Sequence, residues 1–281
     1  MEKRQISIYG KGGVGKSTVA SNLAVALADK GRRVMQVGCS PKSDSTYFIL
    51  GKMCEPTILD RKRAKGSSEK SVIECLKIGY KGIVCAESGG PEPAQGCAGR
   101  GVLLSLNLLK KYQLFEKHET DFIIFDVIAD VVCGGFAQPM RKGFATEVYI
   151  VTSGELMSLY SMNNICYAVK TMNELKGVEV KIGGLIDNMR GVPREKDLVE
   201  EFSKLIETPV IAHIPRNDLI PEAEVYKKTV VEHFPDSDVA SEFRKLAEIV
   251  LEPRGVFPKP MEPKESIPKI LELLRKYQVF A

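Results

Sequence analysis

Short apolar runs alternate along the chain with longer stretches in which apolar residues recur every three to four positions. The short runs predict strands, and the longer stretches predict amphipathic helices. Several runs are apolar at every position, which is typical of strands that helices cover on both faces. We expect strands at 5–9, 33–38, 83–86, 121–127, 147–152, 180–187 and 210–214, and helices at 17–30, 100–115, 157–175, 195–207, 237–251 and 266–277.

The order of these elements predicts an α/β fold. Strands that alternate with helices are typical of repeated βαβ units, so we expect one doubly wound, mostly parallel sheet. Residues 1–252 would form the main domain, and residues 253–281 a Pro-rich connector and a last helix packed on it. The basic run at 60–70 ("DRKRAKGSSEK") also holds Ser and Gly, and we interpret it as a solvated loop.

Composition narrows the class of protein. The 281 residues are 44% hydrophobic and 27% charged, with a net charge of +4, as in an ordinary globular protein. So mild a charge does not indicate a nucleic-acid partner. The N-terminus shows no signal peptide, and no apolar run has membrane-spanning length, so we expect a cytoplasmic protein without a membrane partner.

The cysteines do not form a compact metal-binding motif. There are seven of them, an odd number, and no two are spaced C-x-x-C. This pattern argues against a disulfide framework, a zinc ribbon and a ferredoxin-type site within one chain. We expect Cys54, Cys75 and Cys166 to be small buried side chains.

The stretch "GKGGVGKST" at 10–18 carries the strongest motif. It fits G-x-x-x-x-G-K-[ST], and it follows the first predicted strand and opens the first predicted helix, as in a P-loop. Glycines let backbone N–H groups turn toward phosphate oxygens at the positive end of the helix. Lys16 would reach the outer phosphates, and the Ser17 hydroxyl would bind Mg²⁺. The predicted nucleotide-binding residues here are Gly10, Gly12, Gly13, Val14, Gly15, Lys16, Ser17 and Thr18.

Two acids and one further lysine complete this predicted site. Asp126 ends the buried run "FIIFDV", where a carboxylate near Mg²⁺ belongs. Asp44, in "PKSDST" after the second strand, would lie on the rim near the γ-phosphate. Lys11 resembles the signature lysine of the deviant P-loop ATPases, which include chromosome-partitioning, septum-positioning and arsenite-pump ATPases. In that class, this lysine reaches across a dimer to the partner's nucleotide.

Two cysteines, Cys97 in "GCAGRG" and Cys133 in "DVVCGGF", lie among glycines. Glycines leave backbone N–H groups free to bond to the sulfides of an anionic cluster. A cubane iron–sulfur cluster takes four thiolates, and one chain offers two in this setting. A symmetric dimer would offer four, so Cys97 and Cys133 are candidate ligands of a shared cluster.

The combination of "YGKGGVGKST", "ESGGPEPAQGCAGRG" and "DVVCGGFAQP" resembles the nitrogenase iron protein family. That family includes reductase components of dark chlorophyll synthesis, of nickel tetrapyrrole formation and of methylthio-alkane reduction. The resemblance covers about residues 4 to 250. It implies a homodimer that binds two MgATP and one 4Fe–4S cluster. Such a dimer takes electrons from ferredoxin or flavodoxin and passes them to a larger catalytic partner as ATP is hydrolysed.

The resemblance also implies roles for single residues. Cys97 and Cys133 would be the cluster ligands, and Arg100 would lie on the docking face at the family's ADP-ribosylation position. Cys39 and Cys85 match family cysteines that are not ligands. Lys11, Lys16, Ser17, Asp44, Asp126 and Asp130 would serve the nucleotide and its switches. Asn188 would contact the adenine and Glu224 the ribose, with Asn217 and Asp218 as further candidates.

The chain departs from the family pattern at Ser40, where "GCSPK" stands in place of the usual "GCDPK". A carboxylate there helps couple hydrolysis to the switch in relatives, so this position bears on coupling rather than on MgATP binding. The final electron acceptor stays open among dinitrogen, a tetrapyrrole and a sulfur compound. A partitioning or positioning ATPase and a metal-cluster assembly ATPase are the alternatives to a redox protein.

Overall fold

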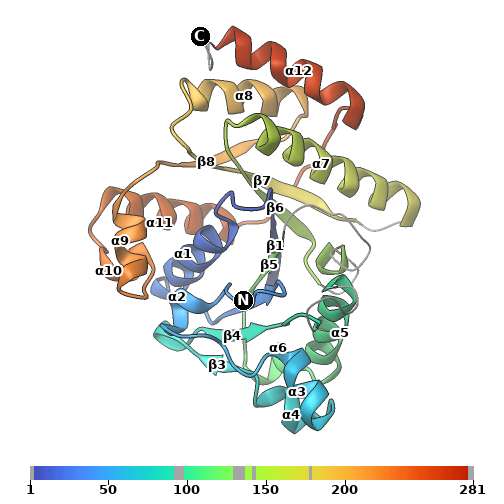
Figure 1. Cartoon of the computed structure of the whole chain (residues 1–281), viewed down its shortest axis with the longest axis vertical. Helices are drawn as coiled ribbons and strands as arrows, with labels where there is room; N and C mark the ends of the chain where they lie inside the picture. The colour runs from blue at the N-terminus through green and yellow to red at the C-terminus, as the bar shows by residue number, and fades with distance from the viewer. Residues whose placement is uncertain (1–2, 92–97, 129–136, 141–143, 177–178, 278–281) are drawn as a thin grey trace.

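The computed structural model describes residues 3–91, 98–128, 137–140, 144–176 and 179–277. Within this part the core is an eight-stranded sheet with the order β3-β4-β2-β5-β1-β6-β7-β8 (Figure 1). Neighbouring strands are parallel except β3 and β4, which are antiparallel. The strands are β1 (Arg4–Tyr9), β2 (Val34–Cys39), β3 (Lys77–Ile78), β4 (Val84–Glu87), β5 (Phe122–Val127), β6 (Glu147–Thr152), β7 (Lys181–Asn188) and β8 (Val210–Ile214).

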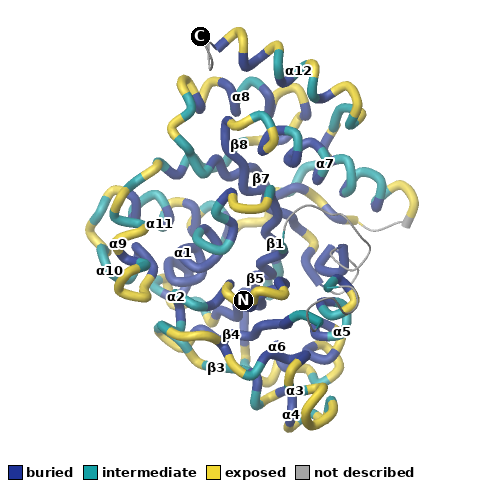
Figure 2. Tube along the Cα trace, viewed as in Figure 1, coloured by how far each residue is buried: buried dark blue, intermediate teal, exposed yellow. Residues whose placement is uncertain are grey.

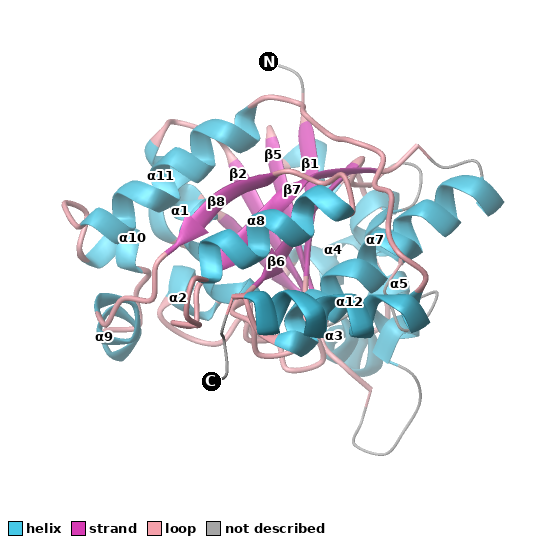
Figure 3. Ribbon diagram, turned by 90° about the horizontal axis from the view of Figure 1, so that it is seen from above, coloured by secondary structure: helices cyan, strands magenta, loops and turns pink. Residues whose placement is uncertain are grey.

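Helices cover both faces of this sheet, as the fully apolar strands predict (Figures 1 and 3). One face carries α1 and α11, and the other carries α5 and α7, with α8 and α12 beside them. The longer helices are α1 (Lys16–Asp29), α5 (Ala98–Lys111), α7 (Leu156–Lys176), α8 (Glu195–Leu205), α11 (Asp238–Leu251) and α12 (Pro263–Lys276). The shorter helical segments are α2 (Tyr47–Leu50), α3 (Ile58–Lys65), α4 (Glu69–Ile73), α6 (Leu114–Lys117), α9 (Leu219–Val225), α10 (Val230–His233), η1 (Tyr80–Gly82) and η2 (Gln138–Met140).

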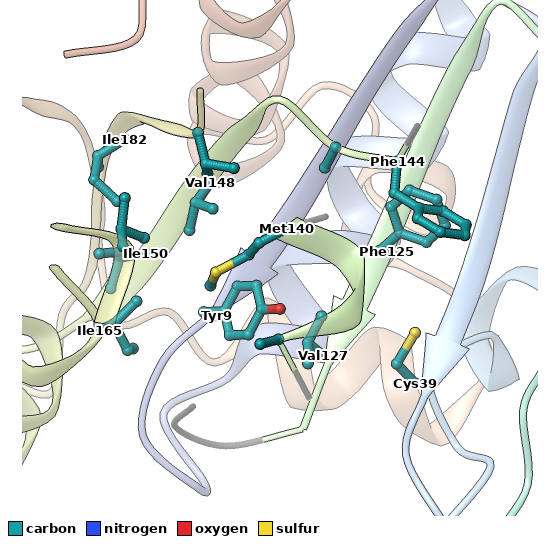
Figure 4. Packing of buried hydrophobic residues seen from close by; sticks show 14 of the residues in the cluster. Tyr9, Cys39, Phe125, Val127, Met140, Phe144, Val148, Ile150, Ile165 and Ile182 are labelled. Carbon is teal, nitrogen blue, oxygen red and sulfur yellow. The ribbon is translucent and has the colours of Figure 1, made fainter. Parts of the chain in front are cut away.

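The side chains of the strands divide between two buried clusters because successive residues of a strand point to opposite faces. Ile6 and Ile8 of β1 pack under α1 and α11, whereas Tyr9 points into the other cluster. Figure 4 shows Tyr9 in that second cluster together with Met140. Figure 2 shows the central strands buried along their length, so the sheet is a rigid support for the loops at its ends.

The expected fold class is confirmed, and all seven expected strands are present with ends shifted by at most one residue. One expectation was wrong: the run at 60–70 is not a loop but forms most of α3 and the start of α4. Thr57 and Ser68 cap these two helices through their side-chain oxygens. Lys62, Arg63 and Lys65 of α3 are exposed, whereas Arg61 is partly buried and forms an ion pair with Glu74. The charged residues of this run therefore lie mainly on the solvent-exposed face of a short helix.

A second difference concerns the helix expected at 100–115. It ends at Lys111, and α6 begins again at Leu114. Gln113 between them has a φ of 53°, a left-handed conformation that a continuous α-helix does not contain. The antiparallel strand β3 and the short helices α2, α9 and α10 were not expected, because segments of two to seven residues are too short to show a period.

The C-terminal segment packs on the same sheet. Val256 forms an isolated bridge with Ile182 of β7, and α12 contacts α7 and α8. The Asn163 side chain of α7 donates to the Met261 carbonyl and accepts from its N–H, both at 2.9 Å. These contacts tie the Pro-rich connector to α7. Among the described residues, no helix is long and apolar enough to cross a membrane.

The order of the strands places the functional loops. From β1 the chain moves first to β2 and β4 on one side of the sheet, and after β5 to β6, β7 and β8 on the other. In open α/β sheets, ligands bind at the carboxyl ends of the strands beside such a reversal. The loops after β1, β2, β5 and β7 meet there.

Candidate functional site

The P-loop joins the end of β1 at Tyr9 to the start of α1 at Lys16. Two of its glycines adopt conformations that other residues rarely take: φ is 148° at Gly10 and 98° at Gly15. A Cβ at Gly10 would lie 2.2 Å from the Val151 carbonyl oxygen. Val14 is buried, and its N–H donates to the Lys11 carbonyl at 3.2 Å. The loop therefore curls over the first turn of α1 in the shape that phosphate binding requires.

Lys16 is buried at the base of this loop. Its ammonium group donates to the Lys11 carbonyl oxygen at 3.0 Å. Lys16 also lies close enough to Asp126 for its charge to lower the pKa of that carboxyl group. The ammonium group is thus fixed to the backbone of the P-loop in the wall of the cavity described next.

A cavity of about 360 Å³ opens in front of the P-loop. The loops after β1, β2 and β5 all contribute to its wall, so it lies at the carboxyl edge that the strand order indicates. Most of the predicted nucleotide residues are in this wall. The lining residues are Gly12, Gly13, Gly15, Lys16, Ser17, Thr18, Ser40, Lys42, Asp44, Asp126 and Ile128.

Asp126 is the buried acid of this cavity. Burial raises the pKa of its carboxyl group, while hydrogen bonds from the Ser17 and Ser45 hydroxyls and the charge of Lys16 lower it. The nearby Asp44 carboxylate raises the pKa further. A carboxylate held between two hydroxyls and an ammonium group, with a second acid on the rim, is a suitable environment for a divalent cation.

The loop after β7 supports the P-loop from behind. The Asn188 side-chain amide donates to the Val14 carbonyl at 2.7 Å, and the Arg190 guanidinium group donates to the Gly13 carbonyl. The Glu195 carboxylate accepts backbone N–H groups of four residues at 2.7–3.0 Å, which fixes this loop against the loop after β6. Those four residues are Gly154, Arg190, Gly191 and Val192.

Three more predicted residues lie around α9: Glu224, Asn217 and Asp218. The Glu224 carboxylate accepts from the Thr18 hydroxyl at 3.5 Å, and burial raises its pKa. Glu224 therefore contacts Thr18 of the cavity wall. The Asn217 side chain instead accepts from the Leu219 N–H at 2.9 Å and turns the chain into α9, and Asp218 occupies the N-cap position of that helix.

The predicted cluster ligands lie outside the described residues. This applies to Cys97 and Cys133, and also to Asp130. The residue after Cys97, Ala98, begins α5, and Arg100 is exposed in the first turn of that helix. Lys11 is partly exposed, and its carbonyl group holds Lys16.

The five cysteines in the described part of the chain are all buried with free thiols. Burial raises the pKa of Cys75 to about 11 and that of Cys54 and Cys166 to about 12. Burial also raises the pKa of Cys39 and Cys85 well above the usual value. These thiols stay protonated at neutral pH and pack as small apolar groups, as expected. No three His, Cys, Asp or Glu side chains among the described residues form a metal-holding group.

Several residues of the site were not predicted from the sequence. Lys42 lines the cavity two residues before Asp44, and its basic side chain in "PKSDST" was the available signal. Ser45, which donates to Asp126, lies in the same stretch. Glu195 begins a helix, and an acid there shows only a favourable helix N-terminus. Nothing in the sequence indicates that four N–H groups from two loops converge on it.

Solved structures with a similar fold are P-loop ATPases. The cell division ATPase MinD of Pyrococcus furiosus superimposes with a TM-score of 0.68 at 25% identity, over 88% of this chain and 98% of that chain. A ParA family ATPase of Chlorobium tepidum superimposes with a TM-score of 0.66 at 21% identity, over 88% and 98%. These similarities agree with the sheet order and the P-loop described above.

Sequence relatives are more specific. The chain is 45% identical to the nitrogenase iron protein of Methanospirillum hungatei over 275 residues, which are 98% of this chain and 96% of that protein. It is 46% identical to nitrogenase iron protein 2 of Methanothermobacter thermautotrophicus, over 98% of this chain and 99% of that protein. The family model of the 4Fe-4S iron sulfur cluster binding proteins, NifH/frxC family, matches residues 4–279. With a P-loop cavity and a match over nearly its whole length, the chain belongs to the NifH/frxC family of 4Fe–4S cluster binding proteins.

Proposed function

We propose that this protein is an ATP-dependent electron donor, a reductase component that passes low-potential electrons to a larger catalytic partner. Its family binds a 4Fe–4S cluster and MgATP. The observation that carries the proposal is that Asp126, in the wall of the nucleotide cavity, precedes Cys133 by seven residues on one stretch of backbone. In this proposal, that short stretch of backbone would link occupancy of the cavity to the position of a cluster ligand.

The cavity supports binding of MgATP. Its volume of about 360 Å³ and the backbone of Gly12 and Gly13 provide room and N–H donors for phosphates. The Lys16 ammonium group would bind the β- and γ-phosphate oxygens, and the Ser17 hydroxyl would hold Mg²⁺. Asp126 would accept from the water molecules around that ion. The Glu224 carboxylate, beside Thr18, would bind the ribose.

Hydrolysis would use the acids around the γ-phosphate. We assign Asp44 and Asp130 to the switch segments that respond to the loss of the phosphate. Lys11, at the start of the P-loop, would reach the nucleotide of a second chain in a homodimer and stabilise the charge of the transferred phosphoryl group. The Ser40 hydroxyl accepts from the Lys42 N–H at 3.1 Å, so this loop keeps its shape without the acid that the family usually has there.

Cys97 and Cys133 of each chain would hold one cluster between two protomers, with their glycine neighbours leaving N–H groups free for its sulfides. The five other thiols are buried and burial raises their pKa values, so they are poor candidates for thiolate ligands, which supports assigning this role to Cys97 and Cys133. When bound, the cluster supplies a one-electron couple of low potential. Arg100, exposed in the first turn of α5, would contact the catalytic partner, and a ferredoxin or flavodoxin would supply the electrons.

In this proposal, residues 1–252 form the ATPase domain, and residues 253–281 stabilise it by packing on α7 and α8. The Asn163–Met261 hydrogen bonds support this division, since they fasten the connector to the domain rather than leave it extended.

The first experiment is the iron content and native mass of protein purified without oxygen, with the EPR spectrum after reduction. About four irons per dimer, with the signal of a reduced cubane, would support the electron donor. The likeness to MinD makes a positioning ATPase the second candidate. Protein that holds no iron after reconstitution, and dimerises only with ATP, would establish that candidate and overturn the first.

A further inference from the structure

Glu87, the last residue of β4, is completely buried behind the nucleotide cavity. One carboxylate oxygen, Oε1, accepts both the backbone N–H and the hydroxyl group of Thr46, each at 2.8 Å. The other oxygen lies against β2, because a Cβ at Gly38 would come within 1.8 Å of it. Glu87 thus joins β4 to the loop that follows β2.

That loop forms one wall of the cavity. Ser40, Lys42 and Asp44 line it, and the Ser45 hydroxyl donates to Asp126. Thr46 comes directly after these residues and begins the turn into α2. A path of hydrogen bonds and backbone therefore runs from Asp126 through Ser45 and Thr46 to the Glu87 carboxylate.

On its other side, Glu87 adjoins the segment that leads to Cys97. The carbonyl group of the next residue, Ser88, accepts from the Leu59 N–H at 3.1 Å and from the Ser105 hydroxyl at 3.3 Å. Ser105 belongs to α5, whose first residue follows Cys97 directly. Movement of Glu87 and Ser88 would therefore displace residues that precede Cys97 in the sequence and residues that follow it.

A second contact joins the same two segments. Gly90 packs so closely on the loop after β2 that a Cβ there would lie 2.4 Å from the Pro41 Cβ. The Gly90 carbonyl also accepts from the Arg63 guanidinium group at 3.0 Å. The cavity loop and residues 87–90 are thus packed against each other, with Glu87 as their buried polar connection.

We propose that Glu87 is a positioning residue that transmits the state of the nucleotide cavity to Cys97, alongside the Asp126–Cys133 connection. This inference rests on the proposed function, since it requires both a bound nucleotide and a cluster. Its physical basis is the pair of hydrogen bonds that buried Thr46 donates to Glu87. Thr46 cannot shift without moving Glu87, because breaking these bonds would leave buried polar groups unpaired, which is costly. The two proposed cluster ligands would then respond to the same nucleotide through different strands, Cys97 through β4 and Cys133 through β5.

The test uses two variants of Glu87, one that keeps an oxygen acceptor and one that removes it. Burial raises the pKa of Glu87 to about 8, so its role as acceptor does not depend on a full negative charge. Glu87→Gln keeps an oxygen acceptor at Oε1, whereas Glu87→Met has a similar length without one. We measure iron content, MgATP affinity, and the rate at which an iron chelator removes the cluster with and without MgATP.

We expect Glu87→Gln to behave as the wild type. In Glu87→Met, iron content and MgATP affinity should be kept, but the acceleration of chelation by MgATP should fall about tenfold. Thr46→Val, which removes only the hydroxyl donor, should show a smaller loss of the same kind. Thr120→Val is the matched control, because Thr120 is a buried threonine whose hydroxyl bonds to the Phe115 carbonyl.

The outcomes separate the two proposals. Wild-type protein without a cluster, or with chelation unaffected by MgATP, would overturn the proposed function and this inference with it. A responsive wild type with full acceleration in Glu87→Met would overturn the inference alone. Should Glu87→Met fail to fold, Thr46→Val decides, and wild-type acceleration in that variant would refute the role of Glu87.

Discussion

The Asn188 side chain, at the end of β7, donates to the carbonyl oxygen of Val14 in the P-loop at 2.7 Å. This bond joins residues that are 174 positions apart in the sequence. It places the amide of Asn188 directly over Gly15, so that a Cβ there would lie 2.3 Å from Nδ2. A residue that the family resemblance assigns to the adenine is thus also a support of the phosphate-binding loop.

The first prediction concerns Gly15→Ala. The new Cβ would collide with Asn188, and alanine at a φ of 98° adds about 1–2 kcal/mol of backbone strain. We expect a lower unfolding temperature and a loss of MgATP binding, measured by thermal denaturation and by calorimetric titration.

Gly31→Ala is the control for this prediction. Gly31 also has a positive φ, 79°, but a Cβ added there would have no other atom within 4 Å. This variant should show the backbone strain alone and keep its affinity for MgATP. Equal losses of affinity in the two variants would contradict the role given to the Asn188 contact.

The second prediction concerns Lys16→Ala. Loss of a charged donor to phosphate costs about 1.5–3 kcal/mol, which is about a 10- to 100-fold weaker affinity for MgATP. The cluster should remain bound, since Lys16 lies in the nucleotide cavity. Chelation of iron in this variant should no longer respond to MgATP, and a wild-type response would show that the P-loop does not control the cluster.

The third prediction concerns the cluster ligands. Cys97→Ser or Cys133→Ser should remove the iron and leave a folded chain that binds MgATP, because each changes a proposed cluster ligand and leaves the P-loop, Asp44 and Asp126 of the nucleotide cavity unchanged. Iron analysis and nucleotide titration on the same sample measure both properties. Cys166→Ser, a buried cysteine of α7, is the control and should keep its iron. Full iron content in either ligand variant would refute the assignment.

The fourth prediction concerns His213 of β8, whose Nδ1 lies 2.8 Å from the buried Asp187 carboxylate. This hydrogen bond raises the pKa of His213, with a further contribution from Glu200 and against the effect of burial. The protonated imidazole therefore stabilises the folded protein. This stabilisation is complete below the unfolded pKa of about 6.5 and is lost as pH rises through the higher folded pKa.

We expect the free energy of unfolding, measured with denaturant, to fall as pH rises through this range. His213→Gln should lose that part of the pH dependence, because glutamine does not titrate. His118→Gln serves as the control for loss of an imidazole. An unchanged pH profile in His213→Gln would show that the Asp187 contact does not stabilise the fold.

The sequence alone predicted the parts of this protein that depend on local patterns. The succession of strands along the chain follows from apolar runs, and the P-loop follows from glycines and a lysine at set spacing between a strand and a helix. Both are local because each is defined within some ten to twenty consecutive residues. The segment at 60–70 shows the limit of such patterns. Its charges predicted an exposed segment, but they did not predict that the segment is helical.

Tertiary structure alone decided which residues support the site. Glu87 reaches Thr46 because β4 lies beside β2, and Asn188 reaches Val14 because β7 and β1 end at the same edge of the sheet. Glu195 accepts four backbone N–H groups from two loops, and a backbone N–H is present at nearly every position, so the sequence does not mark these four. The contacts of Glu87, Asn188 and Glu195 join separate segments of the chain, so no spacing or period records them. They exist only once the parallel strands bring their carboxyl ends together.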